Sequence, residues 1–216
     1  MLKIIGTSHI ARDSIREVTD AINKEAPDII ALELDKGRLR HLFNPEAPKM
    51  QFRDIRSVGL KGWLFAMLGA WAEGKLGKSV GVKPGDEMKA AVRLAREKNI
   101  PLALIDQEIQ ITLKRFSKAL TWKEKFRFLG DIISGVVKRD KIKFDLRTVP
   151  TQHTIDQLIG QVKDRYPNVY RVLVTERNQV MARNLKTLMK VKPDKKILAI
   201  VGAGHEKEIE RLTKTI

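Results

Sequence analysis

Two apolar runs near opposite ends of this sequence are each followed directly by a glycine and, three positions later, by a histidine. The first run, residues 2–5, precedes the tetrapeptide 6–9, and the second run, 197–201, precedes the tetrapeptide 202–205. Short apolar runs bounded by a glycine turn are typical of buried strands, and glycine lets the chain bend sharply before the next helix. The repeated pattern therefore predicts an α/β fold with a parallel sheet.

His9 and His205, two of only four histidines, would then lie at the carboxyl ends of parallel strands. Ligands and catalytic groups collect at that edge of an α/β sheet, where an imidazole can bind a metal or carry a proton. Two other interpretations stay open. Each motif can be a turn glycine with an incidental histidine, and the second motif also begins a dinucleotide fingerprint, although Lys207 replaces its third glycine.

The length of 216 residues fits a single α/β domain, with mainly helical subdomain regions at about 44–80 and 107–165. Periodicity and turn residues predict a central, mainly parallel sheet that is flanked by helices and carries a helical insertion. We expect strands at 2–6, 28–34, 101–105 and 197–201, and helices at about 12–25, 35–43, 84–98, 107–137, 152–164 and 167–190.

The chain contains no cysteine, so any metal site would use histidine, carboxylate or water ligands. This composition suits a reducing cytoplasm, and no export signal opens the sequence. The weakly polar stretch 58–72 contains Lys61 and is shorter than the ~20 apolar residues that cross a bilayer. It fits a buried helix or, alternatively, an interfacial one that contacts a membrane or the second subunit of a homodimer. We therefore expect a cytoplasmic protein without an integral membrane segment, attached to membranes at most peripherally.

The formal net charge of +16 is distributed over several segments of the chain. Such a charge attracts polyanions in a manner that salt weakens, so it favours non-specific association with nucleic acid or acidic lipid. A solvated basic face on a protein of thermophile-like composition is the preferred explanation. No RNA-recognition signature, zinc finger or aromatic-spaced basic motif accompanies the charge.

Carboxylates follow the inner strands as well. Glu33 and Asp35 come after the apolar run 29–32, and Asp106 comes after 101–105. Because parallel strands end at one edge, these groups should meet the two histidines without any local spacing motif. Carboxylate and imidazole together can hold a divalent ion that activates water, which predicts a hydrolytic site with Asp106 among the ligands. Asp35 and Asp106 can instead be ordinary helix N-caps.

Charged residues also occupy helix faces that should be partly buried. Glu176 and Arg177 fall on apolar stripes of the helix predicted at 167–190, and Glu87 shares a face with apolar residues. An interior carboxylate needs a partner or a metal, because leaving it unpaired costs several kcal/mol. A structural ion pair of Glu176 with Arg38 or Arg115 is the alternative to a functional role.

Seven segments resemble the TraB/PrgY (pheromone shutdown) family, which is related to the Tiki proteases and to erythromycin esterase-like and ChaN-like proteins. They cover nearly the whole chain in the family's order: Gly6-Thr7-Ser8-His9, Ala31-Leu32-Glu33-Leu34-Asp35 with Arg38, Pro84-Gly85-Asp86-Glu87-Met88, Leu104-Ile105-Asp106, Ile109-Gln110-Ile111-Thr112-Leu113-Lys114-Arg115, Glu176-Arg177-Asn178 with Met181-Ala182, and Val201-Gly202-Ala203-Gly204-His205.

The resemblance implies an erythromycin esterase or ChaN-like α/β fold with paired Gly-x-x-His motifs and a metallohydrolase-like site, since Tiki members are metal-dependent proteases. His9 and His205 would be metal ligands or acid–base groups. The candidate catalytic carboxylates are Glu33, Glu87 and Glu176, and the candidate anchors for a substrate carboxylate or oxyanion are Arg38, Arg115 and Arg177. Gln107 stands where the family has an arginine, which puts one substrate contact or ion pair in question.

Two functions from different classes follow. The first is a metal-dependent hydrolase that uses Mn, Co or Zn and is peptidase-like. The alternative is a non-catalytic regulatory protein that binds a peptide or a small anion. A third and weaker interpretation is nucleic-acid binding through the basic surface.

Overall fold

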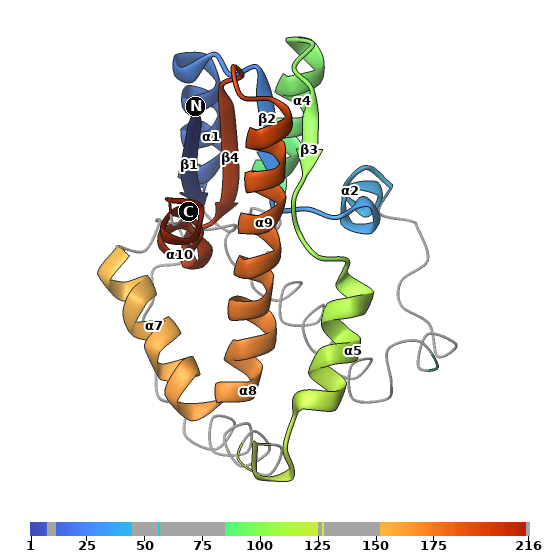
Figure 1. The fold of residues 1–216 in the computed structure, drawn as a ribbon, viewed down its shortest axis with the longest axis vertical. Helices are drawn as coiled ribbons and strands as arrows, with labels where there is room; N and C mark the ends of the chain where they lie inside the picture. The colour runs from blue at the N-terminus through green and yellow to red at the C-terminus, as the bar shows by residue number, and fades with distance from the viewer. Residues whose placement is uncertain (8–11, 45–55, 57–84, 125–126, 128–151, 215–216) are drawn as a thin grey trace.

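The computed structural model describes residues 1–7, 12–44, 56, 85–124, 127 and 152–214 of the chain. Figure 1 shows a parallel sheet with helices on both faces and a group of helices beyond the ends of the strands. His9 and the stretch 58–72 lie outside the described residues, as does most of the helical region predicted at 44–80. The predictions made for them stay predictions.

The sheet has four strands in the order β1-β4-β2-β3, and every pairing is parallel. β1 covers Leu2–Thr7, β2 Ile29–Leu32, β3 Leu102–Leu104 and β4 Ile197–Gly202. All four coincide with predicted strands. The α/β class with a parallel sheet and flanking helices is thus confirmed.

The two glycine-histidine motifs begin side by side. β1 and β4 are neighbours in register, so that Gly6 lies opposite Val201 and Thr7 lies opposite Gly202. Gly6 has no room for a side chain, because a Cβ atom there would lie 2.9 Å from Cα of Ala203 and 2.6 Å from Oε2 of Glu206. The first glycine therefore allows the helix after the second motif to approach the sheet closely.

Alternate residues of the inner strands face opposite ways, as the period of two requires. Ile30 and Leu32 of β2 pack in one apolar core, and Ile29 and Ala31 pack in another on the opposite face of the sheet. Because each strand buries both faces, it reads as a continuous apolar run.

Two helix pairs cover these two faces (Figure 1). α1, Arg12–Glu25, packs on α4, Asp86–Glu97, and both contribute to the first core. α9, Glu176–Val191, packs on α10, Ala203–Lys214, and both contribute to the second core.

The remaining helices lie toward the carboxyl ends of the strands (Figure 1). They are α2, Lys36–Phe43, α5, Ile109–Ala119, α7, Gln152–Arg165, and α8, Pro167–Tyr170. α5 and α7 lie within the region 107–165, whose assignment as a helical subdomain stays a prediction. None of the helices among the described residues is long and apolar enough to cross a bilayer.

Two helix boundaries differ from the prediction. The helix expected from 107 begins at Ile109, because residues 105–108 run from the sheet edge to the helix. The long helix expected at 167–190 is interrupted by a π-helical turn at Arg171–Thr175. A π turn adds one residue to a helical turn, and it leaves no mark in apolar periodicity over so short a stretch.

Candidate functional site

Glu33 and Asp106 are placed by backbone hydrogen bonds that continue the sheet beyond its strands. The amide of Glu33 donates to the carbonyl of Ile200 at 3.1 Å, and the amide of Asp106 donates to the carbonyl of Leu34 at 3.3 Å. Both side chains are buried, with 6% and 8% of the residue exposed. Two carboxylates are thus held at the carboxyl edge of the sheet, as the strand pattern predicted.

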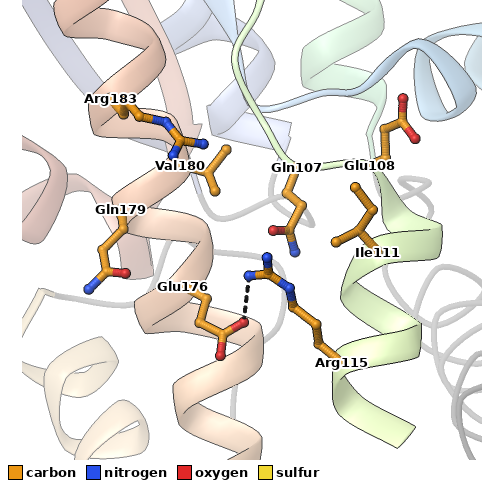
Figure 2. Close-up of a pocket in the computed structure, with 8 residues that line it drawn as sticks. All are labelled: Gln107, Glu108, Ile111, Arg115, Glu176, Gln179, Val180 and Arg183. Carbon is orange, nitrogen blue, oxygen red and sulfur yellow. Dashed lines mark hydrogen bonds and ion pairs between the residues drawn. The ribbon is translucent and has the colours of Figure 1, made fainter. Parts of the chain in front are cut away.

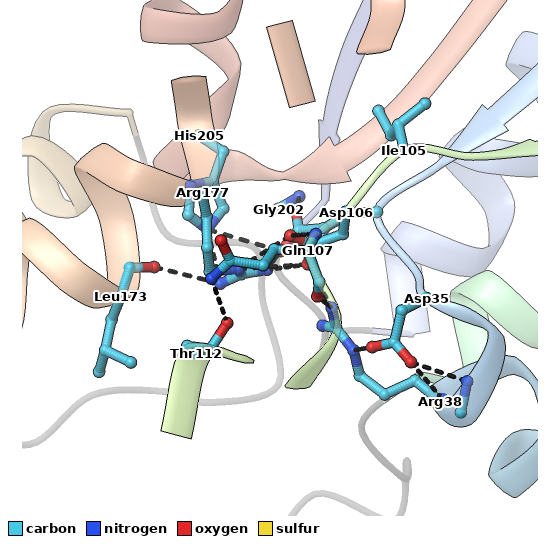
Figure 3. A network of polar contacts seen from close by, with 12 residues as sticks. Asp35, Arg38, Ile105, Asp106, Gln107, Thr112, Leu173, Arg177, Gly202 and His205 are labelled. Carbon is cyan, nitrogen blue, oxygen red and sulfur yellow. Dashed lines mark hydrogen bonds and ion pairs between the residues drawn. The ribbon is translucent and has the colours of Figure 1, made fainter. Parts of the chain in front are cut away.

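Arg177 of α9 binds both of these carboxylates, and Figure 3 shows its contact with Asp106. Its Nε lies 3.2 Å from each carboxylate oxygen of Asp106, and its Nη2 donates to Oδ2 of Asp106 at 2.5 Å and to Oε1 of Glu33. The amide of Gly202 donates to the other oxygen of Glu33 at 2.5 Å. One guanidinium therefore joins α9 to residues that follow two strands.

Asp35 and Arg38 extend this network from α2. Asp35 is the N-cap of α2, and its Oδ1 accepts hydrogen bonds from the amides of Gly37 at 2.7 Å and Arg38 at 3.1 Å. Its Oδ2 accepts from Nε of Arg38 at 2.6 Å, while Nη2 of Arg38 donates to Asp106. The capping interpretation is right for Asp35 and wrong for Asp106, because Glu108 occupies the N-cap position of α5.

His205 lies in the first turn of α10 and is 9% exposed. Its Nδ1 is 2.6 Å from Oδ1 of Asn178, so this ring nitrogen carries the proton and donates. Its Nε2 lies 3.3 Å from Nη1 of Arg177 and 3.5 Å from Oε1 of Glu33. The buried Nδ2 of Asn178 has no hydrogen-bond partner within the described part of the chain.

The charges of this network compensate one another. Burial alone would lower the pKa of Arg177, but the negative charges of Glu33 and Asp106 outweigh it and raise that pKa. Burial also opposes the charge of Arg38, whose pKa is raised by Asp106 and Asp35. Both guanidiniums therefore stay charged.

The described donor atoms do not fit a resident divalent metal in this arrangement. Within the described ranges, no group of three or more His, Cys, Asp or Glu side chains is placed to hold a metal ion. All four carboxylate oxygens of Glu33 and Asp106 accept hydrogen bonds, mainly from Arg177, whose guanidinium takes the position of the neutralising cation. The metal roles of His9, His205 and Asp106 stay predictions.

A pocket of about 310 Å³ lies beside this network, between α5 and α9 (Figure 2). Its lining residues are Gln107, Glu108, Ile111, Arg115, Glu176, Gln179, Val180 and Arg183. Nη1 of Arg115 donates to Oε2 of Glu176 at 3.0 Å across this space. Gln107 connects the pocket to the edge of the sheet, because it follows Asp106 and its Nε2 donates to Oγ1 of Thr112 at 2.9 Å.

One arginine that lines the pocket takes no part in these ion pairs. Arg183 is exposed, lines the pocket, and has no ion pair with any residue that the structure describes. A second hollow of about 290 Å³ shares the lining residues Gln179 and Arg183 and reaches Leu212 of α10. A ligand that enters the pocket can therefore continue over the exposed side of α9.

The structure brings most of the predicted site residues into two adjoining groups. Glu33, Arg38, Asp106, Arg177 and His205 form the buried network, and Arg115 and Glu176 belong to the pocket. The ion pair anticipated for Glu176 is made with Arg115 and not with Arg38.

Two of the predicted site residues, Glu87 and His9, are not assigned to either group. Glu87 is buried in the first turn of α4, with 1% of the residue exposed, and its membership of the site stays a prediction. His9 lies outside the described residues.

Sequence reasoning did not identify Asn178, Gln179 or Arg183 as site residues, nor the π-helical turn. The turn ends immediately before Glu176, so it sets the direction in which Glu176, Arg177 and Asn178 leave the helix. The sequence places Glu176, Asn178 and Arg183 on one predicted helix. No sequence pattern indicates which polar residues of a helix line a pocket.

Comparisons with known proteins identify relatives that match nearly the whole chain. An uncharacterized protein of Methanocaldococcus jannaschii is 35% identical over 99% of this chain and 53% of its own length. TraB domain-containing proteins of human and mouse are 26% and 25% identical over 96% of this chain and 61% of their own length. The chain thus spans between about half and three fifths of the length of these relatives.

The family model that matches describes the TraB/PrgY/gumN family, and the match covers residues 2–214. That range includes all four strands and every residue of the network and the pocket. The chain belongs to the TraB/PrgY/gumN family.

Proposed function

We propose that this chain binds a peptide or a small anionic ligand in the pocket between α5 and α9. The observation that carries the proposal is the pair of arginines, Arg115 and Arg183, that line a space of about 310 Å³. This volume is at the lower end of the ~300–1,000 Å³ range of ligand pockets. Arginine suits the recognition of carboxylate and phosphate, because its planar donors can bind two oxygens at once.

The buried network supports binding because it holds the wall of the pocket in place. Arg177 joins α9 to the sheet edge, and Gln107 is anchored between Asp106 and Thr112. The pocket therefore lies between elements whose relative position is fixed by charge-assisted hydrogen bonds. A site built on such elements needs little ordering when the ligand binds.

Calorimetric titration with short peptides, dicarboxylates and inorganic phosphate tests this function. We expect saturable binding of at least one class, weakened about tenfold by Arg183→Gln, because a charge-assisted hydrogen bond contributes ~1.5–3 kcal/mol. Lys190→Gln makes the same change of charge on an exposed part of α9 and should leave the affinity unchanged. Absence of saturable binding for every probe would contradict the proposal.

Peptide hydrolysis with the help of a divalent metal is the second candidate function. The geometry that favours it is the buried contact of His205 with Glu33 at 3.5 Å, at the carboxyl edge of the sheet. His205 is held through Nδ1 by Asn178, and an imidazole positioned in this way can serve in proton transfer. A bound metal would supply an activated water, and it would require Arg177 to release carboxylate oxygens.

Cleavage of a peptide library with added Mn²⁺, Co²⁺ or Zn²⁺ tests the hydrolase. If Glu176 is a general base, Glu176→Gln should lower turnover by ~100-fold or more, and His205→Ala should abolish it. Because His205 is buried, the fold of that variant must be checked by circular dichroism. If no metal-dependent cleavage of any peptide or ester is found, the binding function alone remains.

A further inference from the structure

The pocket contains a carboxylate that belongs to the protein itself. Glu176 lies across the space from Arg115, and its Oε2 accepts a hydrogen bond from Nη1 of Arg115 at 3.0 Å (Figure 2). Neither partner is fully buried, since 52% of the Arg115 side chain and 24% of the Glu176 side chain are exposed. An ion pair with this exposure contributes only ~0–1 kcal/mol, so another carboxylate can replace it.

We infer that the Arg115–Glu176 ion pair is the unliganded form of a carboxylate-binding site, in which Glu176 occupies the place that a ligand carboxylate takes on Arg115. This inference rests on the proposed binding function and adds the class of ligand and the residue that competes with it. The binding step is an exchange: Arg115 turns from Glu176 to the ligand, and Glu176 keeps its second partner, Arg171, whose Nε lies 4.0 Å from Oε1 of Glu176.

The other lining residues indicate a peptide as the carrier of this carboxylate. Ile111 and Val180 give the pocket an apolar part that suits an aliphatic side chain, and Gln107 and Gln179 offer both donors and acceptors to a peptide backbone. The adjoining hollow that shares Gln179 and Arg183 gives the rest of the peptide a path over α9. We assign the ligand as a peptide whose carboxylate lies next to an aliphatic residue.

Arg183 has a different role in this exchange from that of Arg115. It has no ion pair with a described residue, so it attracts the ligand without first losing a partner. Arg115 gives up Glu176 when the ligand binds. Removing Glu176 should therefore strengthen binding at Arg115, whereas removing either arginine should weaken it.

Glu108 provides a matched control for Glu176. Both are carboxylates that line the same pocket, but Glu108 is exposed, makes no side-chain cap, and in Figure 2 its carboxylate points away from Arg115. Glu108→Gln and Glu176→Gln remove one negative charge each from the pocket. Only the second substitution releases Arg115.

The experiment is a calorimetric titration of an N-acetylated tetrapeptide that ends in leucine with a free carboxylate. Two further peptides distinguish a terminal carboxylate from a side-chain carboxylate as the ligand group. One is the same tetrapeptide with a C-terminal amide, and the other is an amidated peptide with an internal glutamate. We expect Glu176→Gln to bind the acid about fivefold more tightly than the wild type, which corresponds to release from a pair of ~1 kcal/mol. Glu108→Gln should raise the affinity less than Glu176→Gln does, because it removes a charge from the pocket without releasing Arg115, and Arg115→Gln should lower the affinity at least tenfold.

The outcomes separate the inference from the proposed function. If the acid binds but Glu176→Gln binds it no more tightly than Glu108→Gln, the inference is overturned and the binding function stands. The same conclusion holds if the C-terminal amide, which has no carboxylate, binds as tightly as the acid. If no peptide, dicarboxylate or phosphate binds to the wild type or to Glu176→Gln, both are overturned. Thermal denaturation of each variant verifies that the fold is retained.

Discussion

The Nε atom of Arg177 lies 3.2 Å from both carboxylate oxygens of Asp106, across a sequence separation of 71 positions. The same guanidinium binds Glu33, and Arg38 binds Asp106 from the other side. α2, α9 and the ends of two strands are thus joined at one point. This arrangement gives the buried network a structural role that can be measured apart from any activity.

Arg177→Gln should lower the free energy of unfolding by ~3–5 kcal/mol, because it leaves Glu33 and Asp106 as buried carboxylates without their main partner. Urea denaturation at pH 7 measures this change. Arg183→Gln alters the same type of residue on the same helix at an exposed position, and its effect should stay within ~0.5 kcal/mol. Equal losses for both variants would show that the network does not stabilise the fold.

Gly6→Ala should destabilise the protein by ~1–3 kcal/mol, because the added methyl group would lie 2.9 Å from the backbone of Ala203. Gly160→Ala is the control, since a Cβ there meets nothing within 4 Å. Gly160 is inside α7, where alanine favours the helix by ~0.5–1 kcal/mol over glycine. Thermal unfolding should therefore shift in opposite directions in the two variants.

Acid should weaken the fold partly through Glu124. Burial alone would raise the pKa of Glu124, but hydrogen bonds from Asn168 and Thr121 lower it below its ordinary value of 4.5. The unfolded chain thus binds the proton more readily, and the stabilisation is present above pH 4.5 and lost as the pH falls through the folded-state pKa.

Glu124→Gln should consequently be less stable than the wild type at pH 7 and differ less from it at low pH. Urea denaturation of both proteins over a series of pH values measures this difference. Glu210→Gln is the comparison, because Glu210 is exposed and its pKa is lowered by a hydrogen bond from Lys214 at the surface. A constant difference between Glu124→Gln and wild type over the whole range would contradict the prediction.

The net charge of +16 predicts retention on heparin or DNA that is independent of sequence. The retention should be lost at moderate salt, because binding of this kind depends on counterion release. Competition between unrelated duplexes of equal length at two salt concentrations provides the measurement. Tight binding of one sequence that persists at high salt would instead favour a specific nucleic-acid function.

The sheet could be predicted because its signals are local. Each strand is a short, mainly apolar run, and Glu33, Asp106 and His205 come shortly after such runs, so their meeting at one edge follows from parallel pairing alone. The order of the strands needed the structure. The placement of β4 between β1 and β2 depends on packing between segments more than 150 residues apart, for which a single sequence carries no signal.

The sequence predicted that these polar residues gather at the sheet edge, but it did not predict their pairing. Arg38 and Arg177 were expected to bind a substrate carboxylate, and in the structure they bind Asp106 and Glu33. Sequence shows that buried charges need partners, but it does not show which opposite charge lies nearest. Glu176 illustrates this, because Arg38 and Arg115 were open as partners, and the structure pairs it with Arg115 and also with Arg171, which the sequence did not suggest.

The π-helical turn at Arg171–Thr175 makes the protein sensitive to chain length at that point. Deleting one residue there would let an α-helix form without interruption, and every later side chain of α9 would rotate by ~100° about the axis, the angle of one residue. Arg177 would then leave the carboxyl edge of the sheet, unless α9 turned as a whole and exposed Met181 and Leu185. A substitution in this turn can be accommodated by local repacking. After a change in its residue count, α9 cannot keep both its buried apolar residues in the core and Arg177 at the sheet edge.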